Sequence, residues 1–130
     1  MSDVETLIQE KASVAPRVTP AHIESVIKDV TYFTAADGYA GALTSSEEFN
    51  SLPEDERIVQ ASLPLELLTF CVITLKNGFT VTGESACASP ENFNKEIGQK
   101  VAYENAKNKI WALEGYLLKE QLFLGKLLSS

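Results

Sequence analysis

Two runs of β-branched and aromatic residues flank an Asn-Gly pair, and this pattern constrains the fold of the chain most strongly. The first run covers residues 68–76 and the second covers residues 79–84, with Asn77 and Gly78 between them. Asn-Gly readily supplies the positive φ angles of a type I′ turn, which joins two antiparallel strands through two residues. The sequence therefore predicts a β-hairpin over residues 68–84.

A two-residue turn also predicts the register of the hairpin, because side chains alternate between the two faces of a strand. The expected pairs are Lys76–Phe79, Thr74–Val81 and Val72–Gly83. One face is then mainly apolar and is expected to pack on a helix; it carries Phe70, Val72, Phe79 and Val81. The other face is half apolar and half polar, which invites cover by another segment or another chain; it carries Cys71, Ile73, Leu75, Thr80, Thr82 and Glu84.

Two segments have the features of helix starts. Thr19-Pro20 and Ser89-Pro90 each place a capping hydroxyl before a proline that fits the first helical position. Apolar residues follow at helical spacing, which predicts a helix over residues 20–32 and a long helix that begins at residue 90. The long helix has two apolar stripes, so one stripe would meet the hairpin and the other the first helix or a second copy. We therefore expect a homo-oligomer.

These elements predict an α+β fold, with a β-hairpin packed on a long C-terminal helix and a shorter N-terminal helix beside it. Residues 57–62 are a candidate further strand, and residues 32–42 are expected to form a loop or a broken helix. Residues 44–56 are expected to form an exposed connection with one helical turn. We expect residues 1–18 to be a flexible arm, with a short helix near residues 4–11, and residues 19–130 to be a single domain.

The charge and cysteine content argue against several classes of protein. The net charge of −7 over 130 residues disfavours nucleic-acid binding, because phosphate backbones are held by clustered lysine and arginine. Acidity keeps a small protein in solution, and it also suits docking on a basic surface of a partner. Two cysteines and one histidine are too few for a zinc site, so we expect no metal and no cofactor. Cys71 and Cys87 are expected to be free thiols.

The apolar stretches of the sequence are too short for a membrane span. None approaches the roughly 20 residues that cross a bilayer. The first residues lack the basic and apolar regions of a signal peptide. We therefore expect no membrane partner and a cytoplasmic location.

The sequence contains no recognised catalytic motif. A nucleophile elbow, a phosphate-binding glycine loop and a zinc-protease motif are all missing, so we assign no catalytic residue and do not expect an enzyme. His22 is interpreted as an exposed residue in the first turn of a helix. The run from Glu84 to Cys87 brings together an acid, a hydroxyl and a thiol, and an enzyme using Glu84 and Cys87 is the weakest alternative. A tight turn requires the same small residues.

A polar cluster on the predicted long helix is the candidate ligand site. Asparagine is a poor helix former, so two asparagines in one helix indicate amides that bond either to the hairpin backbone or to a polar ligand. Aromatic rings could stack on a base, a lysine could bind a phosphate, and threonine hydroxyls could add hydrogen bonds. The candidate ligand-binding residues are Tyr39, Thr80, Thr82, Tyr103, Asn105, Asn108, Lys109 and Trp111.

The run from Asn77 to Phe93 resembles a known protein family. The resemblance continues through Glu96-Ile97-Gly98, Glu104-Asn105-Ala106 and Asn108-Lys109-Ile110-Trp111, and upstream through residues 17–20 and 32–38. The family consists of small tailed-phage proteins typified by gene product forty-nine of phage N-four and gene sixty-six of phage Sf-six. The resemblance covers about residues 17–118. Ala112 departs from the family pattern, in which proline is common, so we expect a less broken helix here.

The resemblance implies a bacteriophage or prophage origin and a setting in the host bacterial cytoplasm, and it transfers no catalytic residue. By analogy we expect a small accessory protein that binds a host protein during infection, for host takeover or counter-defence. The alternative is a sponge for a small molecule or nucleotide, with its site around the long helix. The expected partners are therefore a host protein or a small nucleotide, together with further copies of the chain.

Overall fold

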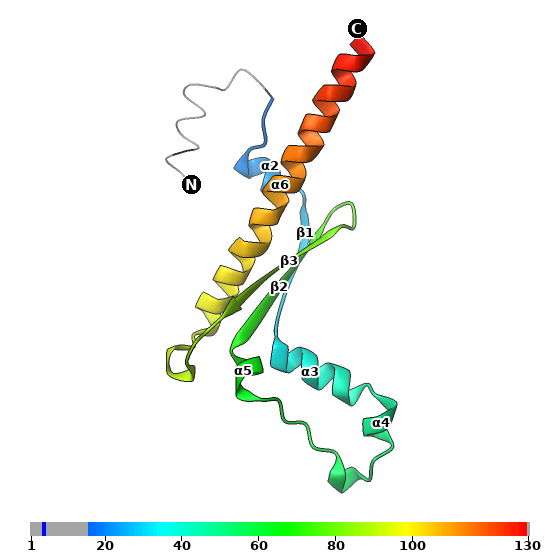
Figure 1. Ribbon diagram of the computed structural model, residues 1–130, viewed down its shortest axis with the longest axis vertical. Coiled ribbons are helices and arrows are strands. Elements are labelled where there is room, and N and C mark those ends of the chain that lie inside the picture. The colour runs from blue at the N-terminus through cyan, green and yellow to red at the C-terminus, as the bar shows by residue number, and fades with distance from the viewer. Residues whose placement is uncertain (1–3, 5–15, 130) are drawn as a thin grey trace. The chain divides into compact units, whose positions relative to one another are not determined.

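The computed structural model describes Val4 and residues 16–129, and its elements form an α+β fold (Figure 1). The α+β class and the packing of the hairpin on the long C-terminal helix are as predicted, and the hairpin belongs to a three-stranded antiparallel sheet with shorter helices before and between the strands. The chain divides into two compact units, residues 26–110 and the two terminal segments up to residue 25 and from residue 111. In chain order the elements are α2 (Pro20–Ser25), β1 (Ile27–Thr34), α3 (Ala35–Thr44), α4 (Glu47–Asn50), η1 (Glu54–Glu56), α5 (Leu63–Glu66), β2 (Leu68–Leu75), β3 (Thr80–Ala86), η2 (Pro90–Asn92) and α6 (Lys95–Ser129).

The predicted hairpin is present as β2 and β3, but its register differs from the prediction by one residue. Thr74 pairs with Thr80, and Val72 pairs with Thr82. The loop has three residues rather than two, because the Leu75 N–H donates to the Phe79 carbonyl at 2.8 Å. Within this loop Gly78 has a φ of 90° and Asn77 does not have a positive φ, which excludes a type I′ turn. A β-turn over residues 75–78 whose last residue, Gly78, is left-handed is the usual three-residue alternative.

This shift changes which face of the hairpin meets the helix. The predicted helix-facing set is wrong for three of its four members, because Phe70 and Val72 lie on the opposite face and Phe79 is exposed. The side chains buried on the helix side are Cys71, Ile73, Leu75 and Val81. The first three belong to the half-polar face of the prediction, and only Val81 belongs to the face that was expected to meet the helix. Side chains alternate along a strand, so one residue of slip exchanges the faces of β3 relative to β2.

The third strand of the sheet is β1, in a region predicted to be helical. The helix that begins at Pro20 ends at Ser25, and Ile27–Thr34 pairs antiparallel with β2. Residues 27–34 are rich in β-branched and aromatic residues, and this composition suits a strand as well as the apolar spacing suits a helix. Pairing with the apolar strand β2 decides between the two. Residues 57–62 form no strand, so that expectation is wrong.

The helix α6 lies on the sheet through small residues. Ala102 and Ala106 are fully buried, and a Cβ built on Gly83 would lie 2.3 Å from the Ala102 carbonyl oxygen and from the Ala106 nitrogen. The backbones of β3 and α6 therefore approach each other more closely than any side chain at position 83 would permit. Gly98, near the start of α6, also lies close to the sheet, but a Cβ there would meet side chains only, with 3.1 Å to the hydroxyl oxygen of Thr69.

Side-chain caps determine where the helices α3, α4 and α6 begin. Thr34 and Asp37 form a reciprocal capping box at the start of α3, so Asp37-Gly38 lies within a regular helix rather than in the loop or broken helix that was expected. The single helical turn expected between residues 44 and 56 is present as α4, capped by Ser46. The long helix begins at Lys95 rather than at Pro90, because Pro90–Asn92 forms a short 3-10 helix and Asn94 accepts from the Ile97 N–H at 3.1 Å.

In the unit formed by the terminal segments, Ile23 of α2 is fully buried. The His22 Nε2 lies 3.1 Å from a carboxylate oxygen of Glu114 on α6. His22 remains half exposed, in agreement with its interpretation as a first-turn surface residue. The expected helix near residues 4–11 and most of the expected arm lie outside the described residues.

Candidate functional site

The structure separates the predicted ligand-binding residues into several places. Thr80 and Thr82 are exposed on the face of β3 that points away from α6. Tyr39 lies on α3 and is 42% exposed. Trp111 belongs to the unit of the terminal segments, whereas the other seven residues belong to the unit of residues 26–110.

The prediction that an asparagine amide bonds either to the hairpin backbone or to a ligand is resolved at Asn105. Its Nδ2 donates to the Glu84 carbonyl at 2.9 Å, so this amide joins α6 to β3. Asn108 and Lys109 are exposed on α6, and Tyr103 has the ammonium of Lys107 at 5.6 Å from its ring centre. A ligand site made of all eight residues stays a prediction.

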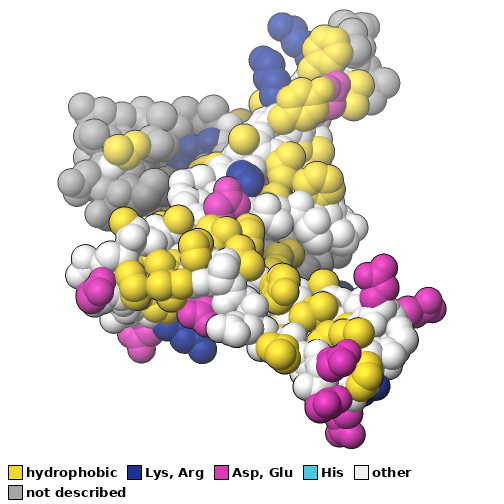
Figure 2. Space-filling view, turned by 60° about the horizontal axis from the view of Figure 1, so that its bottom comes forward, with side chains coloured by type: hydrophobic (Ala, Val, Ile, Leu, Met, Phe, Trp, Pro, Cys, Tyr) yellow, Lys and Arg dark blue, Asp and Glu magenta, His cyan; other side chains and the backbone are white. Residues whose placement is uncertain are grey.

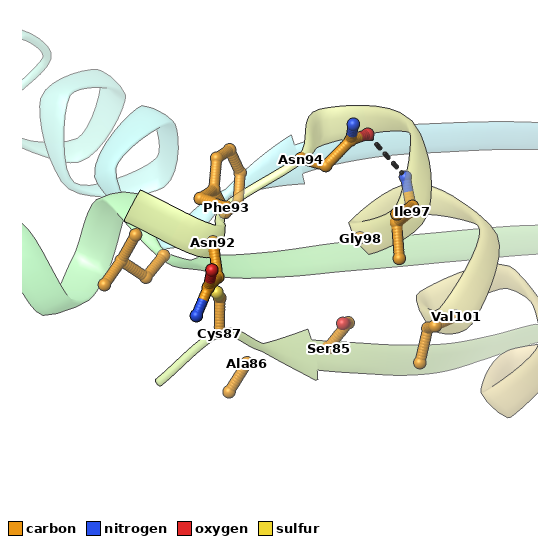
Figure 3. Close-up of a pocket in the computed structure, with 10 residues that line it drawn as sticks. Ser85, Ala86, Cys87, Asn92, Phe93, Asn94, Ile97, Gly98 and Val101 are labelled. Atoms are coloured by element: carbon orange, nitrogen blue, oxygen red, sulfur yellow. Dashed lines mark hydrogen bonds between the residues drawn. The ribbon is translucent and has the colours of Figure 1, made fainter. Parts of the chain in front are cut away.

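A pocket of about 300 Å³ opens where the hairpin ends and α6 begins (Figure 3). Its apolar wall comes from Phe93 and the first turns of α6, and its polar groups come from the end of β3 and the loop before α6. None of the predicted ligand-binding residues lines it. The lining residues are Leu67, Ser85, Ala86, Cys87, Asn92, Phe93, Asn94, Ile97, Gly98 and Val101.

The two thiols differ in their surroundings, and both are free, as expected. Cys71 is fully buried, and desolvation raises its pKa above the ordinary value, which disfavours the reactive thiolate. Cys87 is half-buried at the pocket, where its Sγ–H donates to the Ser89 carbonyl at 3.1 Å. Ser85 lines the same pocket, whereas the Glu84 carbonyl bonds to Asn105 and its side chain is exposed. The region from Glu84 to Cys87 thus ends a strand instead of forming a tight turn.

A second surface combines acidic and apolar side chains. Between residues 47 and 57 the sequence has five carboxylates and a single arginine. Three large apolar residues in or beside this stretch are exposed, namely Leu52 at 40%, Val59 at 45% and Ile58 at 69%. Figure 2 shows acidic side chains gathered beside hydrophobic ones on this part of the molecule. We call this the acidic surface: Glu47, Glu48, Leu52, Glu54, Asp55, Glu56, Ile58 and Val59.

Arg57 organises the backbone of the acidic surface. Its guanidinium donates to the Leu52 carbonyl at 3.0 Å and to the Asn50 carbonyl at 2.9 Å. The α4 turn before it is closed by Asn50, whose Nδ2 donates to the Thr44 and Ser46 carbonyls at 3.0 Å. Residues 44–56 were predicted to be an exposed connection with one helical turn, and the run of acids beside Ile58 and Val59 was the signal that could have indicated an interaction surface.

Neither a metal cluster nor a membrane span is found in the part of the chain that the structure describes. No group of three or more histidine, cysteine, aspartate or glutamate side chains could hold a metal ion among these residues. No helix of this described part is both long enough and apolar enough to cross a membrane.

Comparison with protein-family profiles matches residues 18–122 to the Phage protein (N4 Gp49/phage Sf6 gene 66) family. The match covers most of the chain, so the chain belongs to this family and is a phage protein, as its motifs indicated. No curated protein and no solved structure matches the chain. The family match transfers no activity and no site residue.

Proposed function

We propose that this member of the N4 Gp49/Sf6 gene 66 family is an accessory protein that binds a basic region of a host protein through its acidic surface. The observation that carries the proposal is the exposure of Ile58 and Val59 among five carboxylates. Isolated exposed apolar residues are ordinary on a protein surface, but a cluster ringed by charges of one sign is typical of an interaction site.

The two kinds of side chain would contribute differently. The carboxylates would attract a positively charged partner and raise the association rate, an effect that salt screens. The apolar side chains would supply most of the affinity once they leave water, at about 25 cal/mol per Å² of apolar surface. Binding should therefore weaken with salt without disappearing.

The test compares capture of host proteins by the wild type and by two charge-matched variants. The variant Glu54→Lys/Glu56→Lys reverses two charges within the acidic surface, and Glu96→Lys/Glu104→Lys reverses two exposed charges on α6. We expect a host protein that is retained by the wild type and by the α6 variant and lost by the acidic-surface variant. Ile58→Asp should weaken the purified complex in isothermal calorimetry. Equal capture by all three proteins, or no capture at low salt, would overturn the proposal.

A second candidate function is small-ligand binding in the pocket beside the hairpin end. Its volume of about 300 Å³ is at the lower limit of ligand pockets, and its apolar wall faces a few polar groups, as in many such sites. A small nucleotide at 100 times its dissociation constant would stabilise the protein by about 2.7 kcal/mol. A thermal-shift screen of linear and cyclic nucleotides tests this candidate, with Val101→Trp as a variant whose larger side chain fills the pocket. A flat screen removes it.

A further inference from the structure

The two edges of the sheet differ in how they are covered. At β3, the Asn105 amide donates to the Glu84 carbonyl, and the backbone of α6 lies against Gly83. At β1, the other edge, no further strand pairs among the described residues. An unpaired strand edge presents a row of backbone donors and acceptors to any strand that can reach it.

The known hydrogen bonds indicate which groups of β1 point outward. In antiparallel pairs, alternate residues direct their backbone groups toward the neighbouring strand. The Leu75 N–H bonds to Phe79 on the β3 side, and the Lys76 N–H bonds to the Val26 carbonyl on the β1 side. The backbone N–H and C=O groups of the even-numbered residues of β2 therefore point toward β1. Those of their partners Asp29, Thr31 and Phe33 point toward β2.

Val30, Tyr32 and Thr34 consequently direct their backbone groups to the open edge. The Thr34 N–H is satisfied there by the Asp37 carboxylate at 2.9 Å, which agrees with this assignment. Within the part of the chain that the structure describes, no strand pairs with the two donors and two acceptors of Val30 and Tyr32 along this edge. Their side chains are each 37% exposed although they lie beside the buried residues Ile73 and Cys71.

We propose that β1 is a homodimer interface, in which two copies pair antiparallel about a two-fold axis at Thr31. Val30 and Tyr32 of one copy then exchange four backbone hydrogen bonds with Tyr32 and Val30 of the other. The two sheets become one sheet of six strands, and the exposed Val30 and Tyr32 side chains of both copies cover one another. This proposal does not depend on the binding of a host protein.

The Asp37 cap on Thr34 and the register shift near Lys28 exclude the two neighbouring registers. Centring the pair on Tyr32 would place Val30 opposite Thr34, whose N–H is already bonded to Asp37. Centring it on Val30 would place Tyr32 opposite Lys28, where the register of β1 shifts and a bulge interrupts the edge. Only the pairing centred on Thr31 uses all four available groups.

The charges of β1 favour a second copy as the occupant. Lys28 lies at the start of the strand, and Asp37 lies just beyond its end. In a two-fold antiparallel pair each start adjoins the other end, so Lys28 of each copy approaches Asp37 of the other. Between them, Asp29 lies opposite the uncharged Phe33 of the other copy in this register, and residues 30–34 carry no charge. The edge is therefore complementary to itself in both hydrogen bonding and charge.

A disulfide at the two-fold axis tests the geometry. Thr31 would face Thr31 of the other copy as a pair without mutual hydrogen bonds, with Cα atoms roughly 4.5 Å apart, and this separation lies within the range of disulfides. In a Cys87→Ser background, Thr31→Cys should give a covalent dimer under mild oxidation. Thr82→Cys, exposed on the opposite edge strand, is the control and should give no covalent dimer. Equal cross-linking of the two variants overturns the proposal.

Sedimentation equilibrium of the full chain tests the association itself. Strand pairing buries a small area, so we expect a reversible dimer with a dissociation constant in the micromolar range. Lys28→Glu should weaken it roughly tenfold by placing like charges together, whereas Lys109→Glu on α6 should not. A wild-type chain that stays monomeric at millimolar concentration, or a dimer that ignores Lys28→Glu, overturns the proposal. The first result would leave the β1 edge to a strand of another protein.

Discussion

At the scale of single residues, Gly83 shows most clearly how packing constrains this chain. Its φ is not the reason for glycine, since Gly78 is the only described residue in the left-handed region. The reason is the close approach of α6, because a methyl group at position 83 would overlap backbone atoms of Ala102 and Ala106. Backbone atoms cannot move aside as the end of a flexible side chain can.

Gly83→Ala is expected to destabilise the protein by roughly 2–3 kcal/mol, the cost of overpacking where neither backbone can yield. The matched control is Gly115→Ala on α6, where a Cβ meets nothing within 4 Å. That change should stabilise the protein by about 0.5–1 kcal/mol, because alanine is the better helix former. Urea unfolding measures both. A neutral Gly83→Ala would show that α6 lies farther from β3 than described.

Asp37 should make the stability of α3 depend on pH. Hydrogen bonds from the Thr34 backbone and side chain hold the pKa of Asp37 below its ordinary value of 3.8. A lowered folded-state pKa adds stability at pH values above the unfolded-state pKa, and this stability is lost as the pH falls through the folded-state pKa. Asp37→Ala should cost about 0.5–1 kcal/mol at neutral pH.

The difference between wild type and Asp37→Ala should therefore shrink when the pH is lowered into the acid range. Urea unfolding of both proteins at several pH values, at concentrations too low for dimers, measures it. A difference that stays constant down to strongly acidic pH would show that the carboxylate does not cap α3.

At the scale of elements, strand β1 and the hairpin loop are the two places where the local sequence pattern predicted a structure different from the observed one. The start of α2 was predicted from Thr19 and Pro20. In the structure the Thr19 Oγ1 accepts a hydrogen bond from the His22 N–H at 3.1 Å. Where that helix would end could not be predicted, because the pattern of residues 27–32 fits both a helix and a strand. In the hairpin loop, Asn-Gly is compatible with a two-residue and with a three-residue turn. The difference of one residue exchanges the two faces of β3 relative to β2.

The loop type predicts unequal effects of substituting Asn77 and Gly78. Gly78→Ala should cost about 1 kcal/mol or more, since alanine resists a positive φ. Asn77→Ala should cost about 0.5 kcal/mol, because it removes only the hydrogen bond from the Phe79 N–H to Oδ1. Thermal or urea unfolding compares them. In a type I′ turn both residues need positive φ, so equal losses would contradict the three-residue loop.

At the scale of the whole molecule, the sheet combines a local and a distant strand pairing. The strands β2 and β3 are joined by three residues, whereas β1 reaches β2 only after α3, α4, η1 and α5. Closing a long loop costs entropy before any contact compensates for it, so local pairs form earlier during folding. The acidic surface lies within this long connection.

Variants of the two pairings should therefore act on different rates. We predict that the hairpin is formed in the transition state, so that Gly78→Ala in its loop should slow folding. Phe33→Ala removes a ring that lies 5.6 Å from the ring of Phe70 on β2, and it should mainly accelerate unfolding. Stopped-flow folding and unfolding in urea distinguishes them. The reverse assignment of rates would mean that β1 docks before the hairpin forms.

The sequence alone determined the presence of the hairpin, the start of α2 at Pro20, the single turn at α4 and the phage family. Each of these depends on local chemistry: hydroxyl caps, proline at a helix start, glycine in a turn, and motifs that are contiguous along the chain. Domain organisation and the eight-residue ligand site remain predictions.

Only the tertiary structure decided that residues 27–34 form a strand, which face of the hairpin is buried, and why position 83 must be glycine. These features depend on partners that are distant in the sequence, since β1 becomes a strand by pairing with β2 and Gly83 is required by α6. The edge of β1 that we propose as an interface, and the exposure of Ile58 and Val59 on the acidic surface, likewise appear only once all elements are in place. A pattern read along one segment reports what that segment can form, and contacts between segments select among those forms.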